Sequence, residues 1–141
     1  MTGLGAEWIG IHTGWLFGAY SYGTALGPMW QAVPVIICCN WVIVMSGAIS
    51  LAALFTENRY VLPVFAASIA TAYDWVLEPD ALKLEYWHWQ GGIPLYNYVC
   101  WWGIGLLLTI LWQFFKIKPN QFAVNLFTIQ VLFFALLRTL I

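Results

Sequence analysis

The chain contains 141 residues, of which 62% are hydrophobic, 18% aromatic and only 8% charged. Soluble domains carry about 25% charged residues, so this composition excludes an ordinary water-soluble domain and is typical of a membrane protein. The formal net charge of −1, without a basic run, also argues against nucleic-acid binding. The first residues lack the basic stretch and cleavage site of a signal peptide.

The first predicted segment is Trp8–Met29, which is rich in glycine. Gly10, Gly14 and Gly18 recur every four residues, a spacing that lets membrane helices approach closely. The second half, however, contains polar residues, two more glycines and a proline. The segment is therefore either a full span inside the bundle or a half-helix followed by irregular backbone that lines a cavity. We favour a span with a disrupted end.

Long stretches without charge predict four further membrane spans, because about 20 apolar residues cross the hydrocarbon core. Pro79 is expected to end the second of them, since proline cannot continue a regular helix. A short turn around Lys116–Asn120 makes the last two an antiparallel hairpin. The sequence predicts one integral membrane domain over residues 1–141, an all-α polytopic transmembrane helix bundle. Its four spans, joined by the glycine-rich N-terminal segment, are Val33–Phe55, Tyr60–Leu77, Leu95–Phe115 and Gln121–Leu137.

Two carboxylates at the end of one span are the clearest candidates for chemistry. Asp74 and Glu78 are four residues apart, which places them on one face of a helix. Acidic side chains at membrane depth are costly and normally serve a proton, an ion or a reaction. Two neighbouring carboxyls cannot both ionise cheaply there, so one acid and one base are expected. Alternatively, Glu78 caps the helix end and Asp74 pairs with Arg59 or Lys83.

Glu7 is a third candidate acid, at the start of the glycine-rich segment. A carboxylate near a helix N-terminus is also favoured by the helix dipole alone. Both interpretations, a capping residue and a functional acid, remain open from the sequence.

A second candidate region runs from Tyr86 to Tyr98 and combines aromatic rings with polar groups. Gly91, Gly92 and Pro94 predict a turn above the bundle. The aromatic faces are suited to lining an apolar tunnel and to stabilising a cation, or they form an interfacial belt. Asn97, an amide in the first turn of a span, needs a hydrogen-bond partner.

Several classes of mechanism are disfavoured by what the sequence lacks. It has only two histidines, His12 and His88, whereas membrane di-iron oxygenases need many histidine ligands. Walker, GxSxG and CxxC motifs are absent as well. Acid–base chemistry on a lipid-soluble molecule, without a metal or organic cofactor, is what remains.

The order of these motifs resembles one membrane family. One block comprises Gly14–Tyr22, Leu26–Pro28, Val33-Pro34 and Trp41, and a second comprises Asp74–Pro79, Trp87–Trp89 and Gly92–Asn97. Together they are similar to the carotenoid biosynthesis membrane family, which includes carotenoid 1′,2′-hydratases and bisanhydrobacterioruberin hydratase. The similarity extends from Glu7 to Trp102. Family members carry further helices before the first block, so this chain is expected to be a short variant, a truncated gene or one piece of a larger assembly.

The resemblance implies cofactor-independent addition of water to the terminal double bond of an acyclic carotenoid, giving a tertiary alcohol. Asp74 would donate the proton, and Glu78 or Glu7 would activate the water. The expected partners are a lycopene-like carotenoid, the bilayer of the cytoplasmic membrane, and other pathway enzymes or a second copy, with no nucleic acid. The expected substrate-binding residues are Tyr20, Tyr22, Tyr73, Trp75, Trp87, His88, Trp89 and Asn97.

Two rival interpretations stay open. A membrane lycopene-type cyclase would begin with the same protonation and close a ring. A proton-coupled carrier or assembly subunit would use Asp74 as a proton site without any reaction on a carotenoid.

Overall fold

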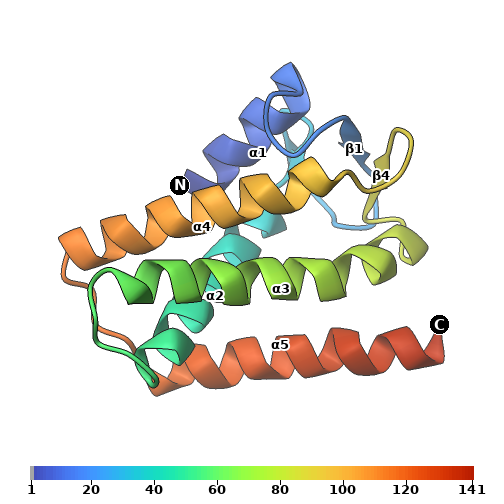
Figure 1. Ribbon diagram of the computed structural model, residues 1–141. Helices are drawn as coiled ribbons and strands as arrows, with labels where there is room; N and C mark the ends of the chain where they lie inside the picture. Colours follow the sequence, from blue (N-terminus) through green and yellow to red (C-terminus); the bar gives the residue numbers. More distant parts are fainter. Residues whose placement is uncertain (1) are drawn as a thin grey trace.

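Five helices dominate the computed structural model, which describes residues 2–141. Four of them, with 18 to 23 residues each, are long and apolar enough to cross a membrane. This confirms the predicted all-α bundle with four spans (Figure 1). The helices are α1 (Thr2–Thr13), α2 (Ile36–Ala53), α3 (Val61–Lys83), α4 (Leu95–Phe114) and α5 (Gln121–Leu140).

The starts of the long helices carry recognisable local signals. The side chain of Asn120 accepts a hydrogen bond from the Ala123 amide at 2.8 Å and thereby caps α5. Asn58 accepts the amide of Tyr60 at 2.9 Å just before α3. Pro94 precedes α4 in extended conformation, where its missing N–H costs nothing.

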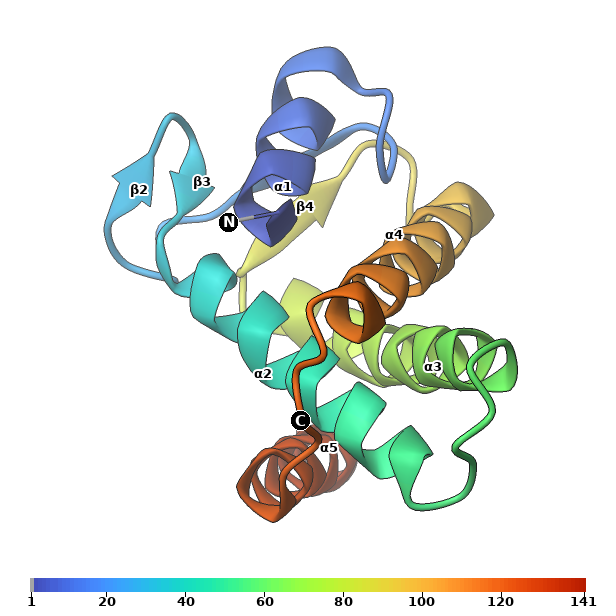
Figure 2. The same ribbon diagram turned by 90° about the vertical axis from the view of Figure 1, so that its left-hand side faces the viewer.

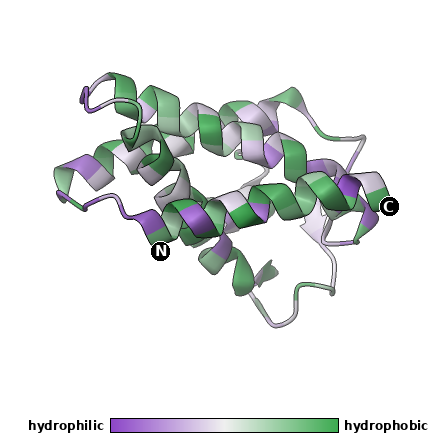
Figure 3. Cartoon of the chain, turned by 90° about the horizontal axis from the view of Figure 1, so that it is seen from below, coloured by the Kyte–Doolittle hydropathy of each residue, from purple (hydrophilic) through white to green (hydrophobic). Residues whose placement is uncertain are grey.

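The helices α3, α4 and α5 run side by side, with α4 antiparallel to both α3 and α5, whereas α2 crosses them obliquely (Figures 1 and 2). The α3 helix packs most extensively against α4, and α5 packs against α2 and α3 (Figures 1 and 2). Apolar residues predominate along the long helices, and many of the hydrophilic residues lie in the turns that join them (Figure 3). This distribution is typical of a multi-pass membrane protein.

The prediction that Trp8–Met29 forms a span is wrong. The helix α1 covers only Thr2–Thr13, and it ends where Gly14 adopts a φ of 67° and donates to the carbonyl of Gly10 at 2.9 Å. Phe17 and Gly18 also have positive φ, which a continuous helix does not allow. The alternative interpretation, a half-helix followed by irregular backbone, describes this segment.

The irregular segment returns to the bundle through two small antiparallel sheets. Strand β1 (Tyr20–Tyr22) pairs with β4 (Trp87–Trp89), with Tyr20 opposite Trp89 and Tyr22 opposite Trp87. Strands β2 (Met29–Trp30) and β3 (Val33–Pro34) form a hairpin. The β1–β4 sheet and α1 lie beside α2 and α4, on the opposite side of the molecule from α5 (Figures 1 and 2).

The expected end of the third helix at Leu77 is also wrong, because α3 continues through Pro79 to Lys83. Proline removes one backbone hydrogen bond, but helices packed among others tolerate that loss. The extra turn buries Asp80 and Ala81 and brings the chain to β4 close to Glu78.

Candidate active site

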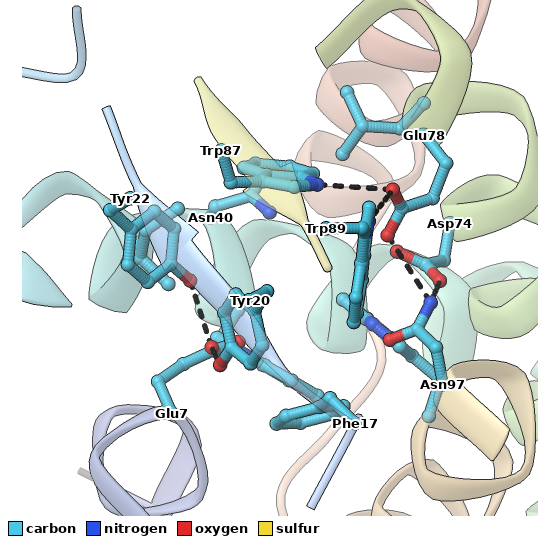
Figure 4. Close-up of a pocket in the computed structure, with 14 residues that line it drawn as sticks. Glu7, Phe17, Tyr20, Tyr22, Asn40, Asp74, Glu78, Trp87, Trp89 and Asn97 are labelled. Carbon is cyan, nitrogen blue, oxygen red and sulfur yellow. Dashed lines mark hydrogen bonds between the residues drawn. The ribbon is translucent and has the colours of Figure 1, made fainter. Parts of the chain in front are cut away.

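Three carboxylates from two helices line one cavity under the cover made by α1 and the β1–β4 sheet. Glu7 comes from α1, whereas Asp74 and Glu78 are one turn apart on α3. Their side chains are only 5%, 1% and 2% exposed. The sequence placed Asp74 and Glu78 on one face, and the fold adds Glu7 from 67 residues earlier in the chain (Figure 4).

The amide of Asn97 joins the two acids of α3. Its Nδ2 atom donates to Oδ2 of Asp74 at 2.8 Å and to Oε1 of Glu78 at 3.2 Å. Asn97 lies in the first turn of α4, so this contact fastens α4 to α3 at the cavity. The expected need of Asn97 for a partner is met by both acids at once.

Two tryptophans of β4 complete the environment of Glu78. The indole N–H groups of Trp87 and Trp89 donate to Oε2 of Glu78 at 3.0 and 2.9 Å. Alternate residues of a strand face the same side, which explains why both indoles reach one carboxylate. Glu78 therefore accepts three hydrogen bonds, whereas Asn97 is the one side-chain donor found for Asp74 in the described part of the chain.

Glu7 has its own set of three donors. The hydroxyls of Tyr20 and Tyr22 donate to Oε2 at 2.5 and 2.8 Å, and the indole of Trp41 donates to Oε1 at 2.9 Å. Burial raises the pKa of Glu7, and these hydrogen bonds oppose that shift. Burial, followed by the proximity of Glu7, raises the pKa of Tyr20 and Tyr22, so both phenols remain donors.

Aromatic rings form the walls between the carboxylates. The rings of Tyr20 and Trp89 lie 5.0 Å apart between Glu7 and the Asp74–Glu78 pair (Figure 4). Trp41 stacks on Trp101 at 4.1 Å with an interplanar angle of 9°. Electron-rich faces close to buried acids suit a site in which a positive charge develops on an apolar molecule.

The cavity is small as it stands. Water-sized molecules can place their centres in about 30 Å³ of it, which is room for one or two waters. The lining is polar enough to bind them through the three carboxylates. A larger apolar substrate requires movement of the α1 and β1–β4 cover.

Three residues predicted for substrate binding lie away from this cavity. His88 is exposed on β4 opposite Ser21, because it alternates with the inward-facing Trp87 and Trp89. Trp75 is 60% exposed, and the guanidinium of Arg138 lies 5.8 Å above its ring. Tyr73 is buried against Phe127 of α5. The cavity does bring together Tyr20, Tyr22, Trp87, Trp89 and Asn97 with the three acids.

Several lining residues were not predicted as part of the site. Leu77 follows Asp74 by three residues, so helical periodicity was a usable signal. Trp41 stood inside the first motif block, but its link to Glu7 required the path of α1. Phe17 reaches the cavity through a positive φ, for which the sequence offers no clear sign. The full set of unpredicted lining residues is Phe17, Ile37, Asn40, Trp41, Leu77 and Trp101.

The alternative ion-pair role for Asp74 has no support in the contacts of the two basic residues. The Nζ atom of Lys83 donates to the carbonyl oxygen of Ile141 at 2.7 Å, and the guanidinium of Arg59 lies 5.0 Å from the ring of Tyr60.

Among residues 2–141, no group of three His, Cys, Asp or Glu side chains is placed to hold a metal ion.

Comparison with known proteins gives two matches. The model of a family described as carotenoid biosynthesis protein matches residues 1–141. The chain is also similar to bisanhydrobacterioruberin hydratase of Haloarcula japonica, at 30% identity over 119 residues. That match covers 78% of this chain and 41% of the relative, so the chain spans about two-fifths of the relative's length. No solved structure gives a significant match.

Proposed function

The chain belongs to the carotenoid biosynthesis protein family, and on this premise we propose that it adds water to the terminal double bond of an acyclic carotenoid. The similarity to a hydratase supports the choice of reaction. The product would be a tertiary alcohol, as protonation of a trisubstituted double bond leaves the charge on its tertiary carbon.

The observation that carries the proposal is the unit Asp74–Asn97–Glu78 beside indole rings in a cavity of water size. Hydration needs an acid that donates a proton to carbon, a group that stabilises the carbocation and a base that activates water. This cavity supplies each of these from neighbouring side chains.

Asp74 is the proposed acid. It has the fewest hydrogen-bond donors of the three carboxylates, so a proton on one of its oxygens displaces no partner. It transfers this proton to C-2′ of the ψ end group. The π bond breaks, a C–H bond forms, and the positive charge moves to C-1′.

The indoles of Trp87 and Trp89 and the ring of Tyr20 stabilise that cation through their faces. Water attacks C-1′ and forms the C–O bond while Glu78 accepts the proton that water loses. Glu78 and Asp74 share the amide of Asn97, so the proton returns to Asp74 over a short path. Glu7 holds the phenols of Tyr20 and Tyr22 in the cavity wall.

The substrate is a long apolar molecule, and we place the protein in the cytoplasmic membrane, where such molecules dissolve. The end group enters when the cover of α1 and β1–β4 opens. Other enzymes of the pathway, or a second copy of the chain, would supply the substrate or take up the product.

The test is mass spectrometry of pigments from bacterial cells that express the chain with lycopene or with bisanhydrobacterioruberin as substrate. A product heavier by one water in the wild type, absent in Asp74→Asn, supports the proposal. Glu57→Gln, in the exposed turn after α2, is the matched control and should give the wild-type product.

Two other results would overturn the hydratase. An isomer of unchanged mass indicates cyclisation. Unaltered pigment from both substrates, with the protein present in the membrane, favours a carrier or assembly role.

A further inference from the structure

A second cavity borders Trp87, which also lines the carboxylate cavity. Its volume is about 180 Å³, and it lies between α2, α3 and α5. It shares four lining residues with the carboxylate cavity, so the two are separated by single side chains. The shared residues are Ile37, Asn40, Leu77 and Trp87.

The second cavity carries polar atoms that are set up to bind water. Gln130 donates through Nε2 to Oδ1 of Asn40 at 2.6 Å, which joins α5 to α2. The Oε1 atom of Gln130 and the hydroxyl of Tyr73 are buried and have no hydrogen-bond partner among residues 2–141. Buried polar groups are rarely left unpaired, and this largely apolar cavity has room for several waters beside the polar atoms that it contains.

The second cavity lies near the start of α2. Its lining includes Leu26 and Tyr86, which lie outside the helices, and Ile36. Ile36 is the first residue of α2, and its side chain is 54% exposed. Part of the lining therefore comes from the start of α2 and from segments outside the helices.

We propose that this second cavity is a water chamber and that Asn40 passes water from it to the reacting carbon in the carboxylate cavity. The inference rests on the proposed hydration. Asn40 is suited to this step, because it lines both cavities and is held by Gln130. Gln130 and Tyr73 are positioning residues that hold the waiting water. Tyr73, which lies outside the carboxylate cavity, thus gains a role.

The chamber determines the fate of the carbocation. When water reaches C-1′, a C–O bond forms and the proton of water goes to Glu78. When water is lacking, a carbon next to the cation loses a proton to a carboxylate and an alkene isomer forms. Alternatively, a nearby double bond attacks the cation and closes a ring, and the new ring cation then loses a proton to a carboxylate. All three routes begin with the same protonation by Asp74, so the water supply changes the product ratio.

The test is Gln130→Leu, which removes both polar ends of the side chain while keeping an apolar residue of similar length. The matched control is Gln121→Leu on the same helix, where the glutamine is exposed and contacts Asn125. Pigments from cells expressing each variant are separated, and each is identified and quantified by mass spectrometry. The level of each variant in the membrane is measured in parallel. We expect Gln130→Leu to lower the ratio of hydrated to isomeric or cyclic product at least fivefold, and Gln121→Leu to leave it unchanged. Tyr73→Phe should shift the ratio in the same direction by less.

The outcomes separate the two proposals. A wild-type protein that hydrates, together with a Gln130→Leu variant of unchanged ratio, overturns the water chamber alone. A proportional loss of every product in Gln130→Leu also overturns it, since that pattern indicates a structural role. A wild-type protein that forms no hydrated product overturns the proposed function and the chamber with it.

Discussion

The side-chain amide of Asn97 lies 2.8 Å from a carboxylate oxygen of Asp74, and this hydrogen bond joins α4 to α3 inside the carboxylate cavity. The same nitrogen reaches Glu78 at 3.2 Å. A single donor thus fixes the distance between the proposed acid and the proposed base.

Replacing Asn97 with leucine should disable this unit. The variant leaves two buried carboxyls without their shared donor, so we expect product formation to fall more than tenfold. The free energy of unfolding should fall by about 1–3 kcal/mol, the cost of unpaired buried polar groups. Initial rates in membranes and thermal unfolding in detergent measure the two effects. The control is Asn125→Leu on the exposed face of α5, and equal losses in both variants would contradict the assignment.

Trp89 should act through both its N–H group and its ring. Trp89→Phe removes the hydrogen bond to Glu78 but retains an aromatic face, whereas Trp89→Leu removes both. A cation–π contact contributes about 0.5–2 kcal/mol, so the leucine variant should be slower than the phenylalanine variant by about 2- to 30-fold. Time courses of product yield at equal membrane levels check this. Equal rates for the two variants would exclude a role for the ring face.

Glu7 should make stability depend on pH. Its pKa is raised in the folded state by burial, so its contribution is fully present below the pKa of the unfolded chain. That contribution is lost as the pH rises through the folded-state pKa. The Tm of the wild type should therefore fall relative to the Tm of Glu7→Gln as the pH is raised from about 4.

Thermal unfolding of both proteins in detergent across this range is the measurement, and Glu57→Gln is the exposed control. If the difference in Tm stays constant, or if the wild type becomes relatively more stable at higher pH, the pKa of Glu7 is not raised in the folded state.

Gly47 should be a packing position for α5. A Cβ atom there would collide with the side chain of Phe127 and lie 3.0 Å from the carbonyl oxygen of Ala123. Gly47→Ala should lower the free energy of unfolding by about 1–3 kcal/mol. In the described part of the chain, a Cβ at Gly103 of α4 meets no atom within 4 Å apart from its chain neighbours and the backbone of its own helix, so Gly103→Ala should raise the free energy of unfolding by up to about 1 kcal/mol. Denaturation in detergent distinguishes the two, and a stable Gly47→Ala protein would contradict the observed packing of α2 on α5.

Much of the architecture was predictable, because charge-free stretches of span length identify four membrane helices directly. The family was predictable from the order of its motifs and is confirmed. The relative placement of Asp74 and Glu78 followed from helical periodicity. The conformation of residues 14–35 was harder to predict. The sequence does not show that Phe17 adopts a positive φ, which a continuation of α1 does not allow. At Pro79 the sequence predicted a helix end that does not occur, because the packed bundle tolerates the proline within α3.

The candidate site was predictable where its residues lie close in sequence and unpredictable where it depends on distant pairing. Trp87 and Trp89 follow Glu78 within eleven residues, and their alternation also explains the outward position of His88. Trp41 enters through a hydrogen bond to Glu7 across 34 positions, and Asn40 is shared with a chamber built partly from α5. Such contacts depend on the tertiary arrangement of α1, α2 and α5.

The most direct test of the account is the mass of the pigment formed by the wild type and by Asp74→Asn in carotenoid-producing cells. We expect a product heavier by one water in the wild type and unchanged substrate in the variant at the same membrane level. A hydrated product of equal yield from Asp74→Asn would show that another group donates the proton and would contradict the central role of the Asp74–Asn97–Glu78 unit.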